Sequence, residues 1–538
     1  MHSDHFNEHY RFGSAGWADE SALCAAGLFD QPGLPVGFHG GRRLWLEGDA
    51  PLITFGGAGT GKLTTVIGHI MCTVKDRSMV VLDPRGEIAA TFLPALAHHG
   101  IEAFLWNPYR LHGLPSHRCN PLDPIDPRLP TFHADCKLAA RSLITVTSKG
   151  EGKYFEQRGS GWVEAKLKYI AAVKGSVTFA DLMYVVNIIE SGTKAWPDFL
   201  KGMTQSAFAD VRRAAGEMIT KQQDGQREFG SIMGETYSGL SALDDPALQH
   251  ALEEPDFSLE AVCASDRPTI VFLMMPAEYL HQSAAVLRQF LTACRLYKSR
   301  NPGGRRLLMV IDEAAQLGHF PALQELYTYG RGIGIQPWTF WQDIGQVENN
   351  FGRSGVDTFL GSSQMRQFLG ARDYRTARLI SDMLGTETLE YDDPRLQGEA
   401  QRQKRLALQR VWQGEDILPA AMEVAHYSRA AKMRTKQGRK LMAEDEVLGL
   451  AGDKHVLFIS GDEPIAVLAD RQAYFRRREF AGLYLPNPYH PPFDSVEIAT
   501  RWGSKRARVI REPVPEKFSS FAQYQMGTWA YVEGYKPT

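Results

Sequence analysis

The sequence predicts an α/β fold in which a parallel sheet is flanked by helices and interrupted by an inserted all-α domain. Between residues 52 and 106, three short runs of β-branched and aromatic residues alternate with helical segments, a pattern typical of parallel strands covered on both faces. In residues 131–262, apolar residues recur at helical spacings of three and four. A strand-like run resumes at 268–276, so we expect the helical block to be an insertion into the sheet domain.

The first run, LITF at 52–55, leads directly into the glycine-rich segment GGAGTGKLTT at 56–65. Glycines let a loop direct its N–H groups at a polyphosphate, and the helix that follows adds partial positive charge. The pattern GxxxxGK fits, but Leu63 stands where Ser or Thr would bind Mg²⁺, and Thr64 and Thr65 come later. A glycine-rich turn without a ligand is the alternative. The order of strand, loop, lysine and helix favours ATP, bound by Gly56, Gly57, Ala58, Gly59, Thr60, Gly61, Lys62, Leu63 and Thr64.

Two further strands of the predicted sheet end in carboxylates. MVVLD ends at Asp83, where ligands of such sheets bind, although a solvated loop carboxylate is an equal alternative. RRLLMVIDE ends at Asp312 and Glu313, and an apolar strand with this ending is common by itself. Together with the upstream loop, it predicts that Asp312 orients the Mg²⁺ shell and that Glu313 polarises the attacking water. Lys62 would contact the β and γ phosphates as a point charge, and Thr64 is the alternative hydroxyl for the metal.

The segment after this strand supplies two more candidates. In YGRGIG, Arg331 lies between Gly330 and Gly332, so we expect a mobile turn with an exposed arginine. It is either a surface residue or an arginine finger, which contributes roughly 10³ to 10⁵ in rate where one operates. In the run IQPWTFWQD, we expect the strand to end at Gln342. This residue is either a water-orienting group or an amide hydrogen-bonded to the backbone. The candidate catalytic residues are therefore Glu313, Arg331 and Gln342.

Composition divides the chain into five segments. Proline-rich passages mark one boundary near residues 107–130, and the strand-like runs HVLFIS and PIAVLA close the sheet domain. The tail is rich in proline and aromatic residues and has the character of a docking extension. The expected segments are a lead-in at 1–50, the first part of the nucleotide-binding domain at 51–130, the insertion at 131–262, the second part at 263–483 and a C-terminal extension at 484–538.

Length and composition indicate an ordinary globular protein of two or three domains. The chain has 538 residues, 43% of them hydrophobic, and a formal charge of −2, so any nucleic-acid binding must come from local patches. Its six cysteines are scattered without a CxxC pair, which argues against a zinc site or a disulfide framework. No apolar run reaches the ~18 to 20 residues of a membrane helix, so we expect a cytoplasmic protein.

Residues 395–440 carry eleven Lys or Arg against four acidic residues. This excess is either a solvated face or part of a nucleic-acid path, for which Trp412 and Tyr427 offer stacking surfaces. We slightly favour the path. Its candidate residues are Arg402, Lys404, Arg405, Lys432, Arg434 and Lys436.

Several of these stretches resemble one family. VVLDPRGE at 80–87, NPLDP at 120–124 and the segment from VIDEAAQLGHFPALQE through GRGIGI to WQDIGQVENNFG at 310–352 resemble the TraG-type coupling proteins, the RecA-like motor ATPases of conjugation and type IV secretion. RKLM with Glu446, and GDEPI before Tyr474, are similar to that family as well. The likeness extends from about residue 12 to about residue 480, most of the chain, with its motifs in one order.

The resemblance implies a RecA-like fold and roles for several residues. Lys62, Asp312 and Glu313 match the family's Walker residues. Arg331 matches its trans-acting arginine, and Gln342 its motif glutamine. The helical insertion matches the all-α domain that receives the substrate. The family implies a homo-hexameric ring that uses ATP and Mg²⁺ to pull single- or double-stranded DNA through its centre, or to hand relaxase or effector proteins to a secretion channel.

The same resemblance sets expectations about location and partners. Relatives carry N-terminal transmembrane helices, so we expect this chain to be a shortened or naturally soluble form or to be anchored by a partner protein. It would work in the cytoplasm at the cytoplasmic face of the inner membrane, with secretion-channel ATPases as further partners. A recruitment platform that uses nucleotide only to set its conformation is the alternative, favoured by Leu63. Glu313, Arg331 and Gln342 favour the motor, because a platform needs no hydrolytic groups.

Overall fold

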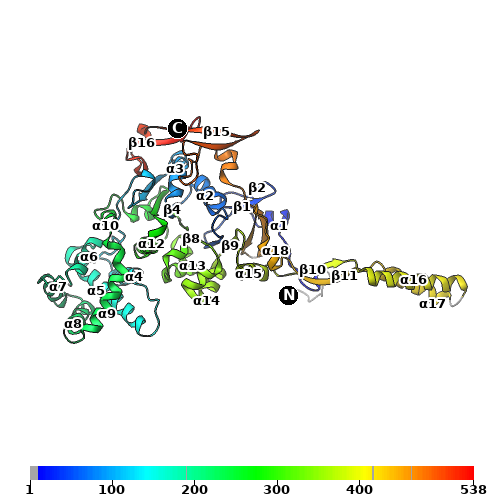
Figure 1. Cartoon of the computed structure of the whole chain (residues 1–538), viewed down its shortest axis with the longest axis horizontal. Helices are drawn as coiled ribbons and strands as arrows, with labels where there is room; N and C mark the ends of the chain where they lie inside the picture. Colours follow the sequence, from blue (N-terminus) through cyan, green and yellow to red (C-terminus); the bar gives the residue numbers. More distant parts are fainter. Residues whose placement is uncertain (1–9, 190, 415–416, 462, 538) are drawn as a thin grey trace. The chain divides into compact units, whose positions relative to one another are not determined.

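The computed structural model describes residues 10–189, 191–414, 417–461 and 463–537 (Figure 1). The chain divides into two compact units. The larger, which we call the sheet unit, comprises Glu20–Gly370 and Ala451–Thr538, and the smaller, which we call the arm unit, comprises Met1–Asp19 and Ala371–Leu450.

The sheet unit is built on an eleven-stranded sheet in the order β2-β1-β13-β12-β9-β3-β8-β7-β4-β6-β5. From β9 to β5 neighbouring strands are parallel, which confirms the predicted parallel sheet, and the strands from β12 to β2 are added antiparallel. The strands are β1 (Leu34–His39), β2 (Arg42–Leu46), β3 (Leu52–Phe55), β4 (Ser78–Pro84), β5 (Glu102–Trp106), β6 (Thr269–Met275), β7 (Leu307–Ile311), β8 (Ile335–Trp341), β9 (Met365–Phe368), β12 (Lys454–Ile459) and β13 (Ile465–Asp470).

The central strands are mostly apolar and fully buried, because helices cover the sheet. Every residue of β3, β4, β6, β7 and β8 is buried, as expected for parallel strands packed on both faces. Phe55 of β3 lies in register with Trp341 of β8 and Phe368 of β9, so large rings fill the region below the carboxyl edge. Helices of the sheet domain and its N-terminal lead-in are α1 (Glu20–Ala25), α2 (Gly68–Thr73), α3 (Glu87–His99), α12 (Ala284–Arg300), α13 (Pro321–Ile333) and α14 (Ile344–Ser362).

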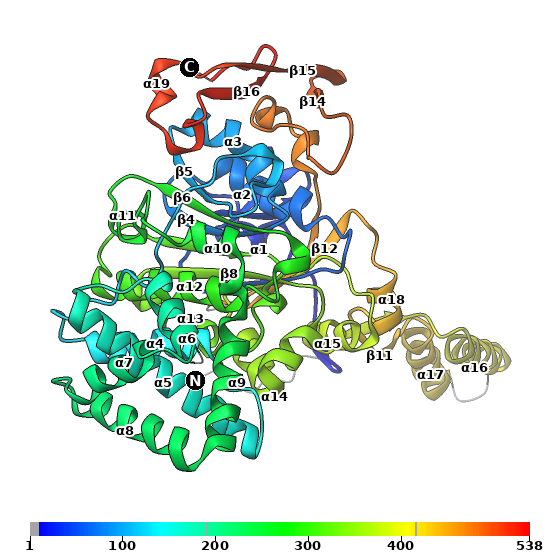
Figure 2. The same ribbon diagram turned by 60° about the vertical axis from the view of Figure 1, so that its left-hand side comes forward.

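The helical insertion lies between β5 and β6, as the sequence predicted (Figure 2). Its first helix packs on the sheet domain, since the hydroxyls of Ser142 and Thr292 lie 2.7 Å apart and Arg288 Nε donates to the Ser142 carbonyl at 2.7 Å. A methyl group on Gly239 would lie 2.9 Å from Ile144 Cγ1, so the chain returns close to where it left. The helices are α4 (Phe132–Leu143), α5 (Glu151–Lys174), α6 (Phe179–Ile188), α7 (Ala195–Thr204), α8 (Ala209–Asp224), α9 (Gln226–Leu240), α10 (Pro246–Ala251) and α11 (Leu259–Ala264).

The C-terminal residues form a second, three-stranded antiparallel sheet of β14 (Ser495–Thr500), β15 (Gly503–Pro513) and β16 (Thr528–Val532), with the short helix α19 (Glu516–Ser519). Gln523 joins this part to β5, because its side chain donates to the Ile101 carbonyl at 3.0 Å and accepts from the Ala103 N–H at 2.8 Å. Its apolar cluster consists of Ala97, Phe518, Tyr524, Trp529 and Tyr531. The tail therefore packs on the first part of the sheet domain.

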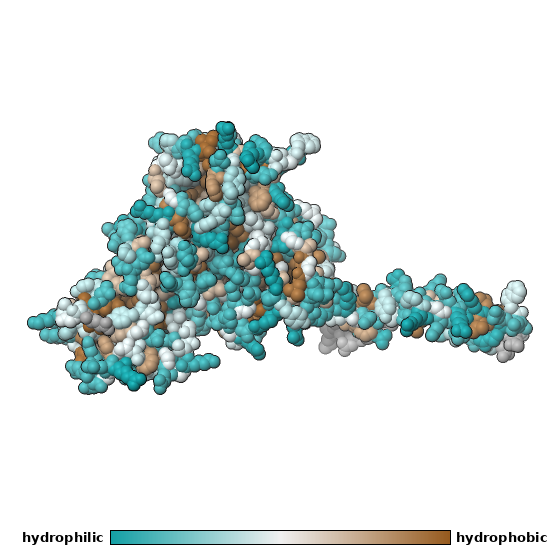
Figure 3. All heavy atoms as spheres, viewed as in Figure 1, coloured by the Kyte–Doolittle hydropathy of each residue, from teal (hydrophilic) through white to brown (hydrophobic). Residues whose placement is uncertain are grey.

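The arm unit contains a β-ribbon and a helical hairpin. Its elements are α15 (Tyr374–Leu384), β10 (Thr386–Tyr391), α16 (Pro394–Gln413), α17 (Ile417–Ala430), β11 (Thr435–Lys440) and α18 (Glu444–Leu448). On α16 the buried side chains are Ala400 and Ala407, whereas Trp412 is 93% exposed. Leu406, Leu408 and Leu418 are exposed as well, and brown apolar side chains are visible on the surface of this hairpin in Figure 3.

Candidate active site

Neighbouring strands deliver the candidate residues to one edge of the sheet. The glycine-rich loop follows β3, Gln342 follows β8 and Asp312 follows β7. Asp83 lies near the end of β4, and these four strands are adjacent in the order β3-β8-β7-β4. Because parallel strands end at the same edge, residues far apart in the sequence meet above their carboxyl ends.

The loop after β3 adopts the turn that its glycines allow. Gly59 and Gly61 have φ of 75° and 87°, in the left-handed region that favours glycine. A methyl group on Gly56 would lie 2.6 Å from Thr60 Oγ1. The following helix opens with a π-helical turn at Leu63–Ile67, a conformation frequently found at functional sites. The loop and the helix start thus present a backbone suited to a phosphate group.

Lys62 lies in a chain of polar contacts that crosses three strands. Its Nζ is 3.1 Å from Glu313 Oε1 and 3.8 Å from Asp312 Oδ1. The other carboxylate oxygen of Glu313 accepts a hydrogen bond from Gln342 Nε2 at 3.3 Å. The Lys62 side chain is only 11% exposed, so these contacts are largely shielded from water. The structure therefore brings together Lys62, Asp312, Glu313 and Gln342.

Glu313 has a backbone conformation that few residues other than glycine adopt. Its φ and ψ are 52° and 46°, in the left-handed region. Two contacts hold the turn: Asp312 Oδ1 accepts from the Glu313 N–H at 3.1 Å, and Asn350 Nδ2 donates to the Ala315 carbonyl at 2.8 Å. Such strain persists where the surroundings impose it, and it is concentrated at functional sites.

Two carboxyl groups lie at the ends of the neighbouring strands β4 and β7: Asp83 is buried, and the side chain of Asp312 is 15% exposed. Burial raises the pKa of Asp83 to about 8, with smaller contributions from the carboxylates of Glu87 and Asp312. Burial also raises the pKa of Asp312 to about 6, which Lys62 opposes and Glu313 and Glu87 favour. Asp83 is fully buried, and its oxygens accept from the N–H groups of Ile88 and Ala89 at 3.2 and 2.8 Å. The alternative of a solvated loop carboxylate is therefore wrong: Asp83 holds the start of α3.

The described side chains suit a metal ion that is bound together with a nucleotide, not one that the protein alone coordinates. Among the described residues, no group of three or more His, Cys, Asp or Glu could hold a metal. Mg²⁺ is usually bound by one or two carboxylates together with phosphates and waters, which Asp312 would satisfy. Leu63 offers no hydroxyl, and the hydroxyls of Thr64 and Thr65 donate to the Gly61 carbonyl at 3.2 and 2.8 Å.

Arg331 lies at the opposite edge of the sheet from the other candidates. It belongs to the last turn of α13 and precedes β8, so the expectation of a mobile glycine turn is wrong: Gly330 and Gly332 are helical. Between Arg331 and Gln342 stand the seven residues of β8, at about 3.3 Å each, a separation of roughly 20 Å. Its side chain is 70% exposed, and Nε lies 2.7 Å from Asp49 Oδ1.

The candidate nucleic-acid residues all lie in the arm unit. Arg434 and Lys436 pair with acidic residues of the same unit, Asp392 at 3.4 Å and Glu390 at 3.1 Å. Lys404 donates to the Ser428 hydroxyl at 3.2 Å. Arg402, Arg405 and Lys432 are exposed. Part of the positive charge of this segment is thus balanced within the unit.

Arg471 contacts the glycine-rich loop and was missed by sequence reasoning. It follows β13, and its Nη1 donates to the carbonyls of Thr60 at 2.7 Å and Leu369 at 3.0 Å. The guanidinium thus ties the loop to the end of β9. A basic residue directly after the run IAVLAD is the only local signal, and it does not reveal that β13 joins this sheet.

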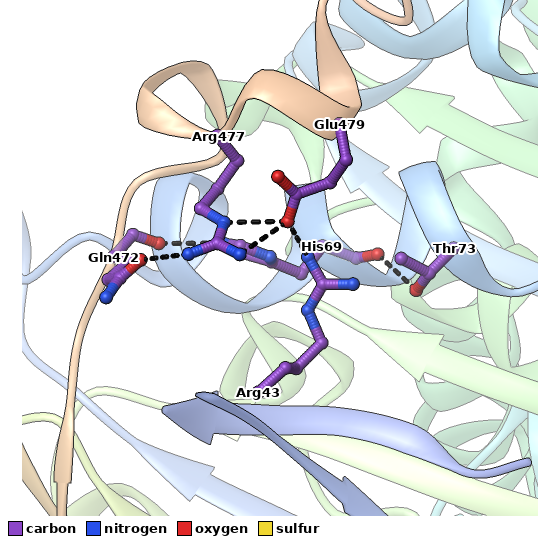
Figure 4. A network of polar contacts seen from close by, with 6 residues as sticks. All are labelled: Arg43, His69, Thr73, Gln472, Arg477 and Glu479. Atoms are coloured by element: carbon purple, nitrogen blue, oxygen red, sulfur yellow. Dashed lines mark hydrogen bonds and ion pairs between the residues drawn. The ribbon is translucent and has the colours of Figure 1, made fainter. Parts of the chain in front are cut away.

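The helix after the loop is anchored by a polar network that includes residues following β13 (Figure 4). His69 Nε2 of α2 lies 2.7 Å from the Gln472 carbonyl, and Arg477 donates to the Gln472 side chain at 2.6 Å. Glu479 accepts from Arg477 at 2.7 Å and from Arg43 of β2 at 2.8 Å. Burial lowers the pKa of His69 to about 4, so the ring is neutral at pH 7. The network holds α2 behind the loop.

Within the described ranges, no single helix is both long and apolar enough to cross a membrane. Two helices joined by a bend, Glu151–Lys174 and Phe179–Ile188, are together long and apolar enough, by length and composition only.

A phosphate-binding type of loop at the carboxyl edge of this sheet, with an aspartate and a glutamate two strands away and an all-α insertion, defines a RecA-type P-loop protein. Residues 11–405 match the family described as "Type IV secretory system Conjugative DNA transfer", and the chain belongs to this family. The resemblance to TraG-type coupling proteins is thereby confirmed.

Two relatives illustrate the similarity. The chain is 22% identical over 467 residues to the type IV secretion system-coupling protein VirD4 of Bartonella henselae, covering 82% of this chain and 66% of the relative. It is 24% identical over 424 residues to the conjugal transfer protein TraG of Escherichia coli, covering 71% and 65%. The aligned part thus spans just under two thirds of each relative.

Solved structures show the same fold. The unbound coupling protein TrwBΔN70 superposes with a TM-score of 0.59 at 15% identity, over 86% of this chain and 95% of that one. TrwB in complex with ADP and Mg²⁺ gives 0.57 at 16% identity, over 86% and 97%. These likenesses confirm the RecA-like architecture predicted from the sequence.

Proposed function

We propose that this protein is the ATPase of a conjugation or type IV secretion system that recruits DNA, or DNA joined to protein, and moves it to the secretion channel. The observation that carries the proposal is a chain of contacts at the carboxyl edge of the sheet. It leads from Lys62 of the loop through Glu313 to Gln342. These three side chains come from separate segments, and their convergence has a direct use in phosphoryl transfer. The ADP and Mg²⁺ bound in the related TrwB structure support the nucleotide assignment.

The geometry defines what each side chain would do. Lys62 pairs with Glu313, and a β or γ phosphate bound in the loop would take over the lysine and release the carboxylate. Glu313, still within hydrogen-bond reach of Gln342, would then accept a proton from the attacking water that both side chains orient. Asp312 would hold Mg²⁺, which when bound neutralises charge on the phosphates. Arg471 would keep the loop in shape through the Thr60 carbonyl.

Arg331 would act on the site of a neighbouring subunit in a homo-hexameric ring. It is separated from its own loop by the length of β8, and its guanidinium, although paired with Asp49, is exposed enough to meet another protein surface. The planar fork suits a phosphoryl group better than lysine does. In this arrangement each active site combines Lys62 from one subunit with Arg331 from the next.

The remaining assignments rest on the family and, for the basic segment, on its excess of positive charge. We propose that the insertion, residues 131–262, receives the substrate and that the basic segment of the arm unit contacts nucleic acid. Of that segment, Arg402, Arg405 and Lys432 are the best placed, since they are exposed. Relaxase or effector proteins, secretion-channel ATPases and a membrane anchor protein are the expected partners, at the cytoplasmic face of the inner membrane.

A nucleotide-regulated recruitment platform is the second candidate, and Leu63 favours it. Without a hydroxyl at this position, the metal would be held more weakly and turnover would be slow. Such a protein would bind ATP and substrates, yet its hydrolysis would not respond to DNA.

The test is ATP turnover by the full-length protein with no DNA, single-stranded DNA and double-stranded DNA. The motor predicts stimulation by DNA and loss of turnover by at least about 100-fold in Glu313→Gln, with ATP binding retained. Basal turnover that DNA does not change would favour the platform. Mixing Lys62→Ala with Arg331→Ala subunits tests the ring, because interfaces with both residues intact should restore part of the activity.

A further inference from the structure

Three charged residues meet at the amino edge of the sheet, opposite the site described above. Asp49 precedes β3, Arg331 precedes β8 and Arg306 precedes β7, and these strands are neighbours in the order β3-β8-β7. Asp49 Oδ1 lies 2.7 Å from Arg331 Nε, and Asp49 Oδ2 lies 2.5 Å from Arg306 Nη2. One carboxylate therefore bridges two arginines that precede adjacent strands.

The backbone of Arg331 is held from two sides. Its carbonyl accepts from Arg306 Nη1 at 2.9 Å and from the Gly334 N–H at 3.1 Å. Gly334 has a φ of 82° and caps α13 in the left-handed conformation that commonly ends a helix. The root of the Arg331 side chain is thus fixed although its guanidinium is exposed.

The segment that carries Asp49 is also fixed. Gln336, a buried residue of β8, donates from Nε2 to the Ala50 carbonyl at 2.9 Å, and Gln364 donates to the Glu47 carbonyl at 2.7 Å. The Asp49 side chain is 20% exposed, compared with 70% for Arg331. The carboxylate is therefore the more rigid member of the pair and sets the direction of the arginine.

The nitrogen through which Asp49 contacts the Arg331 guanidinium decides which of its N–H donors remain available to a phosphate. Within the described part of the chain, the ion pair of Arg331 is made through Nε. The edge formed by Nη1 and Nη2 points away from the nitrogen so engaged and offers two donors in the geometry that suits phosphate oxygens. The carboxylate also offsets repulsion between the two arginines, which would otherwise drive the side chains apart.

We propose that Asp49 and Arg306 are positioning residues for Arg331, holding its guanidinium so that the Nη edge enters the active site of the neighbouring subunit. The inference rests on the proposed function, in which Arg331 acts in trans. Asp49 orients the side chain through Nε, and Arg306 fixes the backbone carbonyl and shares the same carboxylate. Without Asp49 or Arg306, the Arg331 side chain would adopt more conformations. A smaller fraction of them would place the guanidinium at the phosphate.

The first measurement is steady-state ATP turnover by full-length Asp49→Asn and Arg306→Gln, with Asp126→Asn as control. Asp126 pairs with the exposed Arg128 at 2.8 Å, far from the strands concerned in sequence, so its loss should be silent. We expect kcat to fall about 10- to 100-fold in the first two variants while KM for ATP changes less than about threefold. Asp49→Glu, which keeps a carboxylate, should recover part of kcat. Wild-type kcat in both Asp49→Asn and Arg306→Gln would overturn the proposal.

Mixed rings then show on which side of the interface Asp49 acts. Asp49→Asn mixed with Lys62→Ala should regain activity, because some interfaces join an intact loop to an intact Asp49 and Arg331. Asp49→Asn mixed with Arg331→Ala should show no more activity than the two variants show alone, because both defects lie on the same side. The reverse pattern would place Asp49 in its own subunit's site and overturn the proposal.

Mixed rings of Lys62→Ala and Arg331→Ala distinguish failure of the positioning role of Asp49 from failure of the ring mechanism. If that pair regains activity and the Asp49 pattern is reversed, the positioning role is wrong and the ring mechanism stands. If verified mixed rings of Lys62→Ala and Arg331→Ala stay inactive, Arg331 does not act in trans, and the ring mechanism and the positioning role fail together.

Discussion

Replacing Asp83 by asparagine should remove a pH dependence of stability that the wild-type protein has between about pH 5 and pH 8. Burial raises the pKa of Asp83 to about 8 in the folded protein, whereas an unfolded aspartate titrates near its ordinary value of 3.8. Between these values the folded state binds one proton that the unfolded state has released. The contribution of Asp83 to stability is therefore greatest at low pH and is lost as the pH rises through about 8.

The size of the effect follows from the difference between the two pKa values. Each pH unit in this window changes the free energy of unfolding by up to about 1.4 kcal/mol, or up to about 3 kcal/mol between pH 5 and pH 7. Asparagine keeps the shape and one acceptor for the N–H groups of Ile88 and Ala89, but it carries no titrating proton. The stability of Asp83→Asn relative to wild type should thus increase with pH by about 1 to 3 kcal/mol.

Urea unfolding at pH 5, 6, 7 and 8, followed by intrinsic tryptophan fluorescence, to which the buried Trp338 and Trp341 contribute, would measure this difference. Other titrating groups, such as His69 and His455, are present in both proteins, so their contributions largely cancel. Asp126→Asn is the matched control, because hydrogen bonds from Arg128 lower the pKa of Asp126 to about 2, outside the window. Stability curves for Asp83→Asn and wild type that run parallel from pH 5 to pH 8 would refute the reasoning.

Three other changes test the site and the insertion. Lys62→Ala should abolish ATP binding in calorimetry with an unchanged far-UV circular dichroism spectrum, because Lys62 contacts carboxylates at the sheet edge and not the core; wild-type affinity would contradict this. Leu63→Thr should lower the Mg²⁺ concentration for half-maximal turnover, and an unchanged value would mean that Asp312 with waters, or Thr64, already satisfies the ion. Replacing residues 145–238 by a short Gly-Ser linker should leave ATP binding intact, since Gly239 lies against Leu143 and Ile144; insoluble protein with every linker length would show that α5 to α9 are needed for folding.

Local patterns sufficed for the fold class and for the outline of the site. Apolar runs identified β3, β4 and β7, because a strand buried on both faces is mostly apolar. The loop around Lys62 was recognisable because glycines and a lysine at fixed spacing carry their function within seven residues. The helical insertion was predicted because apolar residues begin to recur at spacings of three and four, a pattern that is also visible among residues close in sequence.

Other features depended on which distant segments become neighbours. Asp83 was ambiguous in the sequence because burial, not residue type, decides whether a carboxylate is solvated. Arg331 was expected in a mobile turn because two glycines flank it, yet packing of α13 on the sheet overrides their low helix propensity.

The contacts of Arg471 with the loop and of Asp49 with Arg331 and Arg306 leave no local pattern. By itself, the sequence determined the central strands, the loop and the chemical groups available at their ends, whereas β1 and β2 lay in the expected lead-in. The order of strands in the sheet decided which of those groups meet at the carboxyl edge and which meet at the amino edge, because strand order is set by long-range pairing and crossover helices rather than by residues adjacent in the chain.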